Sequence, residues 1–306
     1  MNKIKPWILA ARPKTLFAAL APIIIGLSIS FSIFEEINYI VAIFTIITAI
    51  LIQIGSNYAN DAYDYLKGSD QNDIRKGPDR MAQSGKLAPK TILNVMYFIF
   101  IIALFLGFYL AIVGGWPIII MGLSSIFFAI IYTGGPFPLG YNGLGDIAVF
   151  IFFGIVATFG TVYLQYQAIS PAITLFDFIP KIILASCAIG CLNTAILVVN
   201  NIRDYKSDKQ SNKNTLVVIF GQQFGCFQYS ALLLISIICF LVLGILYQNY
   251  WLIITMSLSF FLGTFLIRKI FNYKIANLNK ALEKTAQFAF LNALLFATSI
   301  FINLLL

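Results

Sequence analysis

Two clusters of acidic and amide side chains lie where long apolar stretches of this 306-residue chain end. In the segment GSNYANDAYDYLKGSD, Asn57, Asp61 and Asp64 are spaced i, i+4 and i+7, which places them on one helix face. The segment LVVNNIRDYKSDKQ carries a second set at i, i+4 and i+8, which also shares one face: Asn200, Asp204 and Asp208. The same arrangement of one amide and two carboxylates therefore occurs twice.

Neighbouring carboxylates repel one another unless a cation holds them together. Hard oxygen ligands on two helices suit Mg²⁺, which binds through a few carboxylates, water and substrate phosphates. Basic residues are interleaved with both clusters, as a diphosphate would require: Lys67, Arg75, Lys76, Arg80, Arg203, Lys206, Lys209 and Lys213. We therefore expect a magnesium-dependent diphosphate site. The alternative, a pair of solvated helix ends, does not account for the repeated Asn-x3-Asp spacing.

Two loops carry further candidate residues. In KGPDRMAQSGKL, Arg80 has the reach to bind a phosphate, whereas Asp73 and Asp79 are interpreted as solvated loop charges. The segment YTGGPFPLGYNGLGD contains neither Lys nor Arg, and its Gly and Pro residues favour a structural turn. Tyr132 and Tyr141 in this segment are candidates for lining the mouth of a pocket.

The composition limits the chemistry that is open to the chain. It contains no histidine, which excludes His-based acid–base catalysis, a Ser-His-Asp triad and most zinc or haem sites. The four cysteines lie inside apolar runs, so helix packing is favoured over metal binding, even for Cys187 and Cys191 one helical turn apart.

Membrane-spanning helices must position the clusters. With 60% hydrophobic and 10% charged residues, the chain is far more apolar than a soluble domain, in which about a quarter of residues are charged. A span needs about 20 apolar residues. We expect an all-α membrane protein with a single domain over residues 1–306 and nine spans: 15–33, 38–62, 91–112, 117–133, 144–166, 178–202, 223–247, 251–268 and 285–305.

The distribution of basic residues indicates the orientation. With nine spans, every Lys and Arg except Lys181 falls on one side, which the positive-inside rule identifies as cytoplasmic. We therefore expect a multi-pass protein of a bacterial cytoplasmic (inner) membrane, with its N-terminus in the cytoplasm and its C-terminus outside. The net charge of +8 then reflects topology and contact with anionic membrane lipids, and no nucleic-acid partner is expected.

The two clusters also indicate an internal repeat. Four predicted spans separate Asp61 from Asp204, so the second and sixth helices run in the same direction and present both clusters on the cytoplasmic side. This arrangement favours a parallel repeat in which helices two and six are equivalent.

These residues resemble the signature of the UbiA superfamily of intramembrane prenyltransferases, which carries NDxxDxxxD after its second helix and DxxxD after its sixth. Asn60-Asp61-x-x-Asp64 matches the first part of one motif, and Asp204-x3-Asp208 matches the whole of the other.

Two departures point to one branch of the superfamily. Gly68 replaces the third aspartate of the first motif, and the role of Asp70, two residues on, stays open. The YxxxK element is missing because Pro136 stands four positions after Tyr132, where that element has Lys. Both features resemble the 1,4-dihydroxy-2-naphthoate polyprenyltransferases, which make menaquinone precursors. The chain also shares three sequence elements with that branch: ARPKTL (Ala11–Leu16), GPxRxxQSG (Gly77–Gly85) and YTGGPxPLxYxGLGD (Tyr132–Asp146).

The resemblance implies a nine-helix bundle around a central cavity that opens toward the cytoplasm. The implied reaction transfers a polyprenyl group from a polyprenyl diphosphate to 1,4-dihydroxy-2-naphthoate, with decarboxylation, to give demethylmenaquinone. Mg²⁺ is the implied cofactor, held by the catalytic aspartates and two supporting amides: Asp61, Asp64, Asp204, Asp208, Asn57 and Asn200. The implied substrate-binding residues are Asn57, Asn60, Arg80, Asn200, Arg203, Lys206, Tyr132 and Tyr141.

Two alternatives stay open. Enzymes of the same superfamily that prenylate 4-hydroxybenzoate or homogentisate differ in cavity shape, which the sequence does not give. A secondary transporter would also have many helices, a repeat and charged residues near membrane depth. The position of the acids at helix ends beside basic loops, and not at the bilayer midplane, favours the enzyme. The prenyl chain length and the residues that bind the aromatic acceptor do not follow from the sequence.

Overall fold

The computed structural model describes residues 4–69, 77, 80–170, 172–273 and 277–305. All regular secondary structure in these residues is helical, as expected. The chain begins with α1 (Lys5–Ala11), the 3₁₀ turn η1 (Pro13–Thr15) and α2 (Leu16–Phe34). Arg12, with φ 51°, adopts the left-handed conformation that ends α1 and turns the chain into α2.

The other helices follow in chain order. They are α3 (Tyr39–Leu66), α4 (Pro89–Gly114), α5 (Trp116–Ile131), α6 (Gly145–Phe150), α7 (Ala157–Ile169), α8 (Ile179–Gln210), α9 (Leu216–Phe220), α10 (Gln222–Leu246), α11 (Tyr250–Phe271) and α12 (Leu278–Leu305). A π-helical turn, η3 (Ile151–Val156), joins α6 to α7, and two 3₁₀ turns complete the set: η2 (Leu139–Tyr141) and η4 (Leu175–Phe178).

Each of the nine predicted spans coincides with a helix. By length and composition, eight helical segments within the described residues can cross a membrane, with α1–α2 and α6–η3–α7 each forming one segment. The ninth prediction, 117–133, corresponds to α5, which has only 16 residues. The expected all-α, multi-span architecture is therefore confirmed, with one short member.

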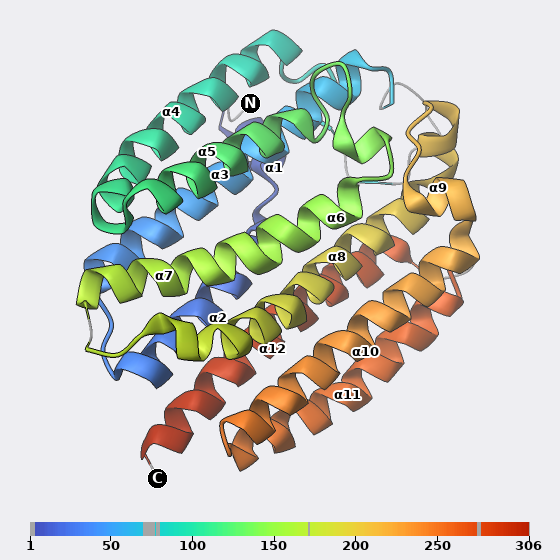
Figure 1. Ribbon diagram of the computed structural model, residues 1–306. Helices are drawn as coiled ribbons and strands as arrows, with labels where there is room; N and C mark the ends of the chain where they lie inside the picture. The colour runs from blue at the N-terminus through green and yellow to red at the C-terminus, as the bar shows by residue number, and fades with distance from the viewer. Residues whose placement is uncertain (1–3, 70–76, 78–79, 171, 274–276, 306) are drawn as a thin grey trace.

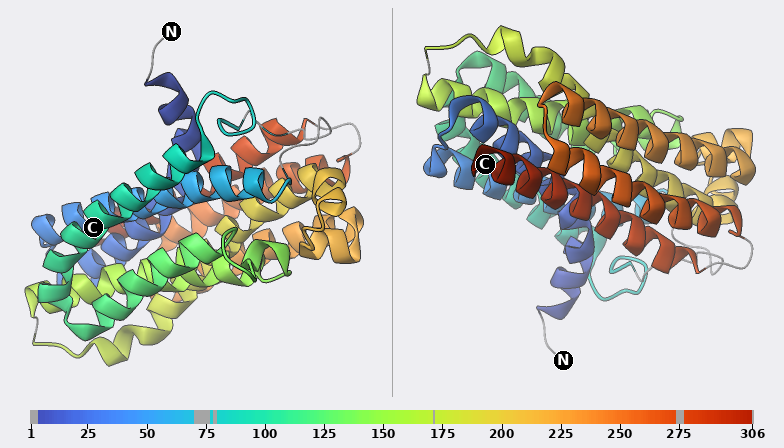
Figure 2. Two further views of the ribbon diagram at one scale, coloured as in Figure 1. Left: turned by 90° about the horizontal axis from the view of Figure 1, so that it is seen from above. Right: turned by 90° about the horizontal axis from the view of Figure 1, so that it is seen from below.

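The long helices lie side by side in one bundle, and α8 is the most enclosed of them (Figure 1, Figure 2). In the most apolar 18-residue stretch of the segment that contains α8, 72% is buried within the protein. The corresponding share in the other seven membrane-spanning segments is at most 44%. The outward faces of the peripheral helices carry large apolar side chains such as Phe105, Phe108 and Trp116, which suit contact with lipid tails. The helix that bears the second acidic cluster thus forms the centre of the molecule.

A pair of glycines brings two helical segments into close contact. A Cβ atom on Gly154 of η3 would lie 2.7 Å from the Cα of Gly190 on α8 and 2.7 Å from the carbonyl oxygen of Ser186. Small residues of this kind let helices approach to backbone contact inside a membrane. This contact fixes the position of α8 beside the α6–α7 segment.

Long-range contacts gather the basic segments at one end of the bundle. Lys14, before α2, forms an ion pair of 2.9 Å with Glu283 of α12. Lys213, after α8, approaches Asp64 at the end of α3. The N-terminal segment, the start of α12 and the loops after α3 and α8 therefore share one end, as the alternation of spans requires.

Candidate active site

A cavity of about 1520 Å³ opens inside the bundle, with the first acidic cluster at one end. Its walls are mainly apolar and come from both halves of the chain, including α2, α3, α5, α7, α8 and α12. Charged side chains line its mouth: Asp61, Asp64, Arg80, Arg203 and Lys213. Such a space combines a charged entrance with a hydrocarbon-like interior.

Asp64 is the centre of the charge network at the mouth. Nη2 of Arg80 donates to Oδ2 of Asp64 at 2.9 Å, and the phenol of Tyr141 donates to Oδ1 at 2.9 Å. Nζ of Lys213 lies 3.8 Å from the same Oδ2. Because Asp64 is only 2% exposed, these donors provide the stabilisation that a buried carboxylate requires.

Asp61 holds the loop that delivers Arg80. Its two carboxylate oxygens accept hydrogen bonds from the backbone N–H groups of Met81 at 3.1 Å and Ala82 at 3.0 Å. The turn is thereby fixed immediately after Arg80, which explains how a loop residue reaches Asp64. Each carboxylate oxygen keeps a second lone pair, so this contact is compatible with metal binding.

The second cluster is organised around Arg203. Its guanidinium forms a two-point ion pair with Asp204, with distances of 2.8 Å from Nε and 2.6 Å from Nη2. Nη2 also donates to Oδ1 of Asn200 at 2.7 Å. Arg203 and Asn200 line the cavity, whereas Asp204 and Asp208 are buried beside it and are not part of its surface.

Lys213 connects the two clusters. Its backbone N–H donates to the carbonyl of Asp208 at 2.9 Å, and its ammonium group lies near Asp64. The adjacent Asn214 donates its backbone N–H to the carbonyl of Tyr141 at 3.0 Å. The segment after α8 therefore binds both the first cluster and the loop after α5, bringing the two motifs to one mouth.

The two amides of the first motif bind neighbouring segments. Nδ2 of Asn57 donates to the carbonyl of Ala11 at 2.8 Å and to Oγ1 of Thr15 at 3.0 Å, which holds the turn between α1 and α2. Oδ1 of Asn60 accepts from Oγ1 of Thr133 at 3.0 Å. These amides position the cavity walls, and Asn60 also lines the cavity.

The glycine- and tyrosine-rich loop after α5 contributes directly to the mouth. The ring of Tyr141 faces the ammonium groups of Lys67 and Lys213, at 5.2 and 5.3 Å from its centroid. Burial lowers the pKa of Lys67, an effect that the charge of Asp64 partly offsets. The loop is therefore more than a turn, because Tyr141 joins the carboxylate of Asp64 to two cations.

Tyr132, which follows α5, lines the cavity. Its hydroxyl lies close to the start of α6, because a Cβ atom on Gly145 would be 3.0 Å from it. The loop after α5 therefore contributes one tyrosine to the cavity wall and one, Tyr141, to the charge network.

Five of the predicted site residues do not line the cavity: Asn57, Tyr141, Asp204 and Asp208 are buried, and Lys206 points away from the site. Lys206 is exposed. The reason is the helical period, since a residue two positions after Asp204 points to the opposite side of α8. Asp70, whose role was left open, lies outside the described residues.

The donor set fits Mg²⁺ only together with a phosphate ligand. In the parts of the chain that the structure describes, no three Asp, Glu or Cys side chains cluster closely enough to hold a metal by themselves. Mg²⁺ characteristically uses one or two carboxylates and completes its shell with water and substrate phosphates. Asp64, on the cavity lining, matches this incomplete, all-oxygen type of site, and the expected roles of Asp61, Asp204 and Asp208 as ligands stay predictions.

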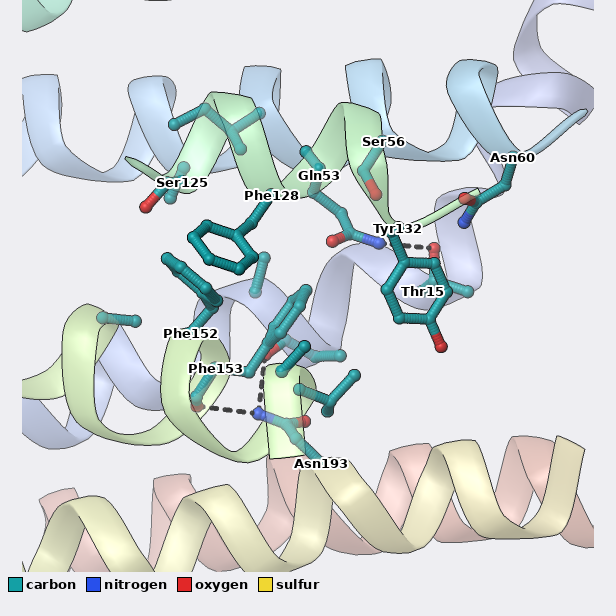
Figure 3. Close-up of a pocket in the computed structure, with 18 of the residues that line it drawn as sticks. Thr15, Gln53, Ser56, Asn60, Ser125, Phe128, Tyr132, Phe152, Phe153 and Asn193 are labelled. Atoms are coloured by element: carbon teal, nitrogen blue, oxygen red, sulfur yellow. Dashed lines mark hydrogen bonds between the residues drawn. The ribbon is translucent and has the colours of Figure 1, made fainter. Parts of the chain in front are cut away.

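Polar residues inside the spans were missed by sequence reasoning. Figure 3 shows Gln53 and Ser56 of α3 facing the pocket from one side and Asn193 of α8 from the other, with the rings of Phe128 and Phe152 between them. The available signal was an amide in the middle of an apolar span, which is costly and therefore often functional. Arg12, from the ARPKTL segment, also lines the cavity.

Comparison with known proteins agrees with this geometry. The profile of the UbiA prenyltransferase family matches residues 19–294. The chain is 34% identical to the 1,4-dihydroxy-2-naphthoate octaprenyltransferase of Escherichia coli (strain K12), over 99% of this chain and 97% of that protein. The proteins of the same name from Haemophilus influenzae and Mycobacterium tuberculosis are 35% and 33% identical, over 84% and 77% of both chains, respectively.

Solved structures show the same fold. A UbiA homologue from Archaeoglobus fulgidus bound to DMAPP and Mg²⁺ aligns over 97% of this chain and 99% of its own, with a TM-score of 0.67 and 13% identity. The apo structure of a UbiA homologue from Aeropyrum pernix K1 aligns over 99% and 100%, with a TM-score of 0.69 and 12% identity.

Proposed function

The chain belongs to the UbiA prenyltransferase family, and from this premise we propose that it transfers a polyprenyl group from a polyprenyl diphosphate to 1,4-dihydroxy-2-naphthoate. The observation that carries the proposal is the cavity itself, whose charged mouth opens onto a long apolar interior. The diphosphate fits the mouth and the hydrocarbon tail fits the interior. The naphthoate acceptor is supported by three relatives of that name at 33–35% identity.

In the proposed reaction, the allylic C–O bond of the diphosphate breaks and the departing electron pair leaves with the diphosphate. Arg80, Arg203 and Lys213 stabilise this negative charge at the mouth. Asp64, which lines the cavity, would hold Mg²⁺ together with the diphosphate, and the metal would supply further neutralisation. Asp61 acts by holding the Arg80 loop in place.

The remaining steps depend on the interior walls. The allylic cation is shielded from water by apolar side chains, and the ring faces of Tyr132, Phe128 and Phe152 stabilise its charge. A new C–C bond forms to the electron-rich naphthoate ring, and the carboxylate departs as carbon dioxide while its bonding electrons stay in the ring. The product is demethylmenaquinone in its quinol form.

We also propose the orientation and location. The enzyme lies in a bacterial cytoplasmic membrane with the charged mouth facing the cytoplasm, where soluble acceptors and Mg²⁺ are available. The clustering of the basic segments at the mouth end supports this orientation.

The test is a reaction with protein purified in detergent, one polyprenyl diphosphate and Mg²⁺. Mass spectrometry should find prenylated product from 1,4-dihydroxy-2-naphthoate, and carboxyl-labelled substrate should release one labelled carbon dioxide per product. If the protein instead prenylates 4-hydroxybenzoate or homogentisate, the proposed acceptor is wrong and the enzyme belongs to another branch of the superfamily. Because detergent abolishes any ion gradient, product formation there also contradicts the transporter alternative.

A further inference from the structure

Asn193, in the middle of α8, binds two carbonyl groups that lack their usual helical partners. Its Nδ2 donates to the carbonyl of Ala18 at 3.1 Å and to that of Phe153 at 3.2 Å. Four residues after Ala18 stands Pro22, which has no N–H to offer within α2. In the π-helical turn η3, the N–H of Ala157 bonds to the carbonyl of Phe152, which leaves that of Phe153 without this donor.

These contacts fix which way the amide points. Both N–H bonds of Asn193 are used by carbonyl oxygens, which accept and do not donate, so the amide cannot be turned over without placing oxygen against oxygen. The side-chain carbonyl must therefore point away from α2 and η3. Figure 3 shows the two hydrogen bonds of Asn193 and its remaining oxygen, which points away from them.

The remaining oxygen is a buried acceptor without a donor. Asn193 is 3% exposed, and no donor among the described residues reaches its Oδ1. Asn193 lines the cavity, but its Oδ1 exposes almost no surface, so a ligand supplies the missing hydrogen bond only if it presses into this part of the wall. Since a buried polar group without a partner is unfavourable, the site is prepared for a molecule that brings an O–H or N–H group.

The chemistry of the two substrates decides which one fits. A prenyl diphosphate has a hydrocarbon tail and a diphosphate that accepts hydrogen bonds, so it has no donor to offer at this depth. The aromatic acceptor carries two ring hydroxyls, each of which is a donor. The cavity that Asn193 lines has aromatic side chains in its walls, Phe128, Phe152 and Phe153, which suit a flat aromatic molecule.

We propose that the side-chain carbonyl of Asn193 accepts a hydrogen bond from a ring hydroxyl of the aromatic acceptor and so selects for hydroxylated acceptors. This inference rests on the proposed function. Asn193 becomes a substrate-binding residue in addition to a structural link between α2, η3 and α8.

The experiment compares wild-type protein with Asn193→Leu, using 1,4-dihydroxy-2-naphthoate and two analogues that each lack one hydroxyl. Wild type should bind one analogue about tenfold more weakly than the parent, the loss expected for one buried hydrogen bond. Asn193→Leu should bind that analogue and the parent equally, and the KM for the prenyl diphosphate should stay unchanged. Equal binding of all three compounds by the wild type overturns the proposal, as does discrimination that survives in Asn193→Leu.

Two further variants separate binding from stability. Asn292→Leu removes another buried amide, which bonds Ser259 and Phe288 away from the cavity lining; it should lower stability without changing acceptor discrimination. If Asn193→Leu does not fold, the change is repeated with Pro22→Ala, which gives Ala18 a helical donor again. Should that pair also fail to fold, the wild-type analogue series alone decides.

The outcome also distinguishes this proposal from the function on which it rests. If no dihydroxynaphthoate is prenylated, the proposed function fails. If it is prenylated while Asn193→Leu discriminates between the acceptors as the wild type does, only the role of Asn193 fails.

Discussion

At the scale of single residues, the carboxylates at the mouth are held by cations of the chain itself. The sequence led us to expect repulsion that an external metal must relieve. In the structure, Arg80 binds Asp64 and Arg203 binds Asp204, so much of that repulsion is already offset. A metal must therefore compete with the arginines, and we expect Mg²⁺ to bind well only when a diphosphate engages them.

The first prediction concerns Asp64→Asn, which removes one anionic oxygen without changing side-chain volume. We expect the Mg²⁺ concentration needed for half-maximal activity to rise at least tenfold, on the order of the loss seen for groups that support metal sites. The protein should also unfold at a lower temperature, because Arg80 loses its buried partner. A magnesium titration of activity and a thermal melt measure both effects.

The control for this prediction is Asp177→Asn, because Asp177 is exposed and lies at the far end of the bundle. Equal magnesium titration curves for the two variants would refute the role of Asp64.

The second prediction concerns the phenol that donates to Asp64. Tyr141→Phe keeps the ring that faces Lys67 and Lys213 and removes only the O–H group. With about 1 kcal/mol lost from one hydrogen bond, we expect kcat to fall about fivefold. Steady-state kinetics of this variant are compared with those of Tyr250→Phe, whose ring is 76% exposed. An unchanged kcat would mean that the loop after α5 is structural only.

At the scale of elements, the site depends on how closely α8 packs against its neighbours. The contact between Gly154 and Gly190 sets the spacing between η3 and α8, and thus the position of Asn193, Asn200 and Arg203 along the cavity wall. The predicted equivalence of α3 and α8 as members of an internal repeat stays a prediction, supported by their shared amide and aspartate spacing.

The third prediction tests this packing with a matched pair of glycines. In Gly154→Ala the new methyl group would lie 2.7 Å from backbone atoms that cannot rotate away, so we expect a loss of roughly 1–3 kcal/mol in the free energy of unfolding. In Gly122→Ala the methyl group enters open space, and higher helix propensity should leave stability unchanged or slightly raised. Thermal unfolding in detergent measures both. Equal melting temperatures would show that the contact of η3 with α8 tolerates expansion.

At the scale of the whole molecule, basic segments before α2 and after α8 meet acidic partners at one end of the bundle among the described residues. Under the proposed orientation, the positive-inside rule would place this end and the cationic mouth next to the anionic lipid surface of the cytoplasmic side. A long substrate tail can therefore stay in the apolar interior while its diphosphate reaches the charged mouth. We therefore propose that the same basic residues set the orientation and attract the diphosphate.

The fourth prediction tests the orientation. In a variant without the four native cysteines, single cysteines at Lys86 and Asn212 should react with an impermeant thiol reagent only from the cytoplasmic side. A cysteine at Gln248, beyond α10, should react only from the opposite side; all three positions are exposed. Reaction of positions 212 and 248 from the same side would show that α10 does not cross the membrane.

The sequence by itself determined the elements and the chemistry of the mouth. Spans are readable because a bilayer demands about 20 apolar residues from each helix, whatever its neighbours are. The faces that carry Asp61, Asp64, Asp204 and Asp208 are readable because the helical period is fixed. The same period places Lys206 on the opposite side of α8, and its expected role in substrate binding stays a prediction.

Only the tertiary structure decided which groups meet. The pairing of Arg80 with Asp64 depends on a loop held by Asp61, and the approach of Lys213 to Asp64 joins segments 149 residues apart. The orientation of Asn193 depends on a proline in α2 and a π-helical turn before α7, neither of which is near it in sequence. Contacts of this kind arise from the packing of distant helices, and local periodicity carries no information about them.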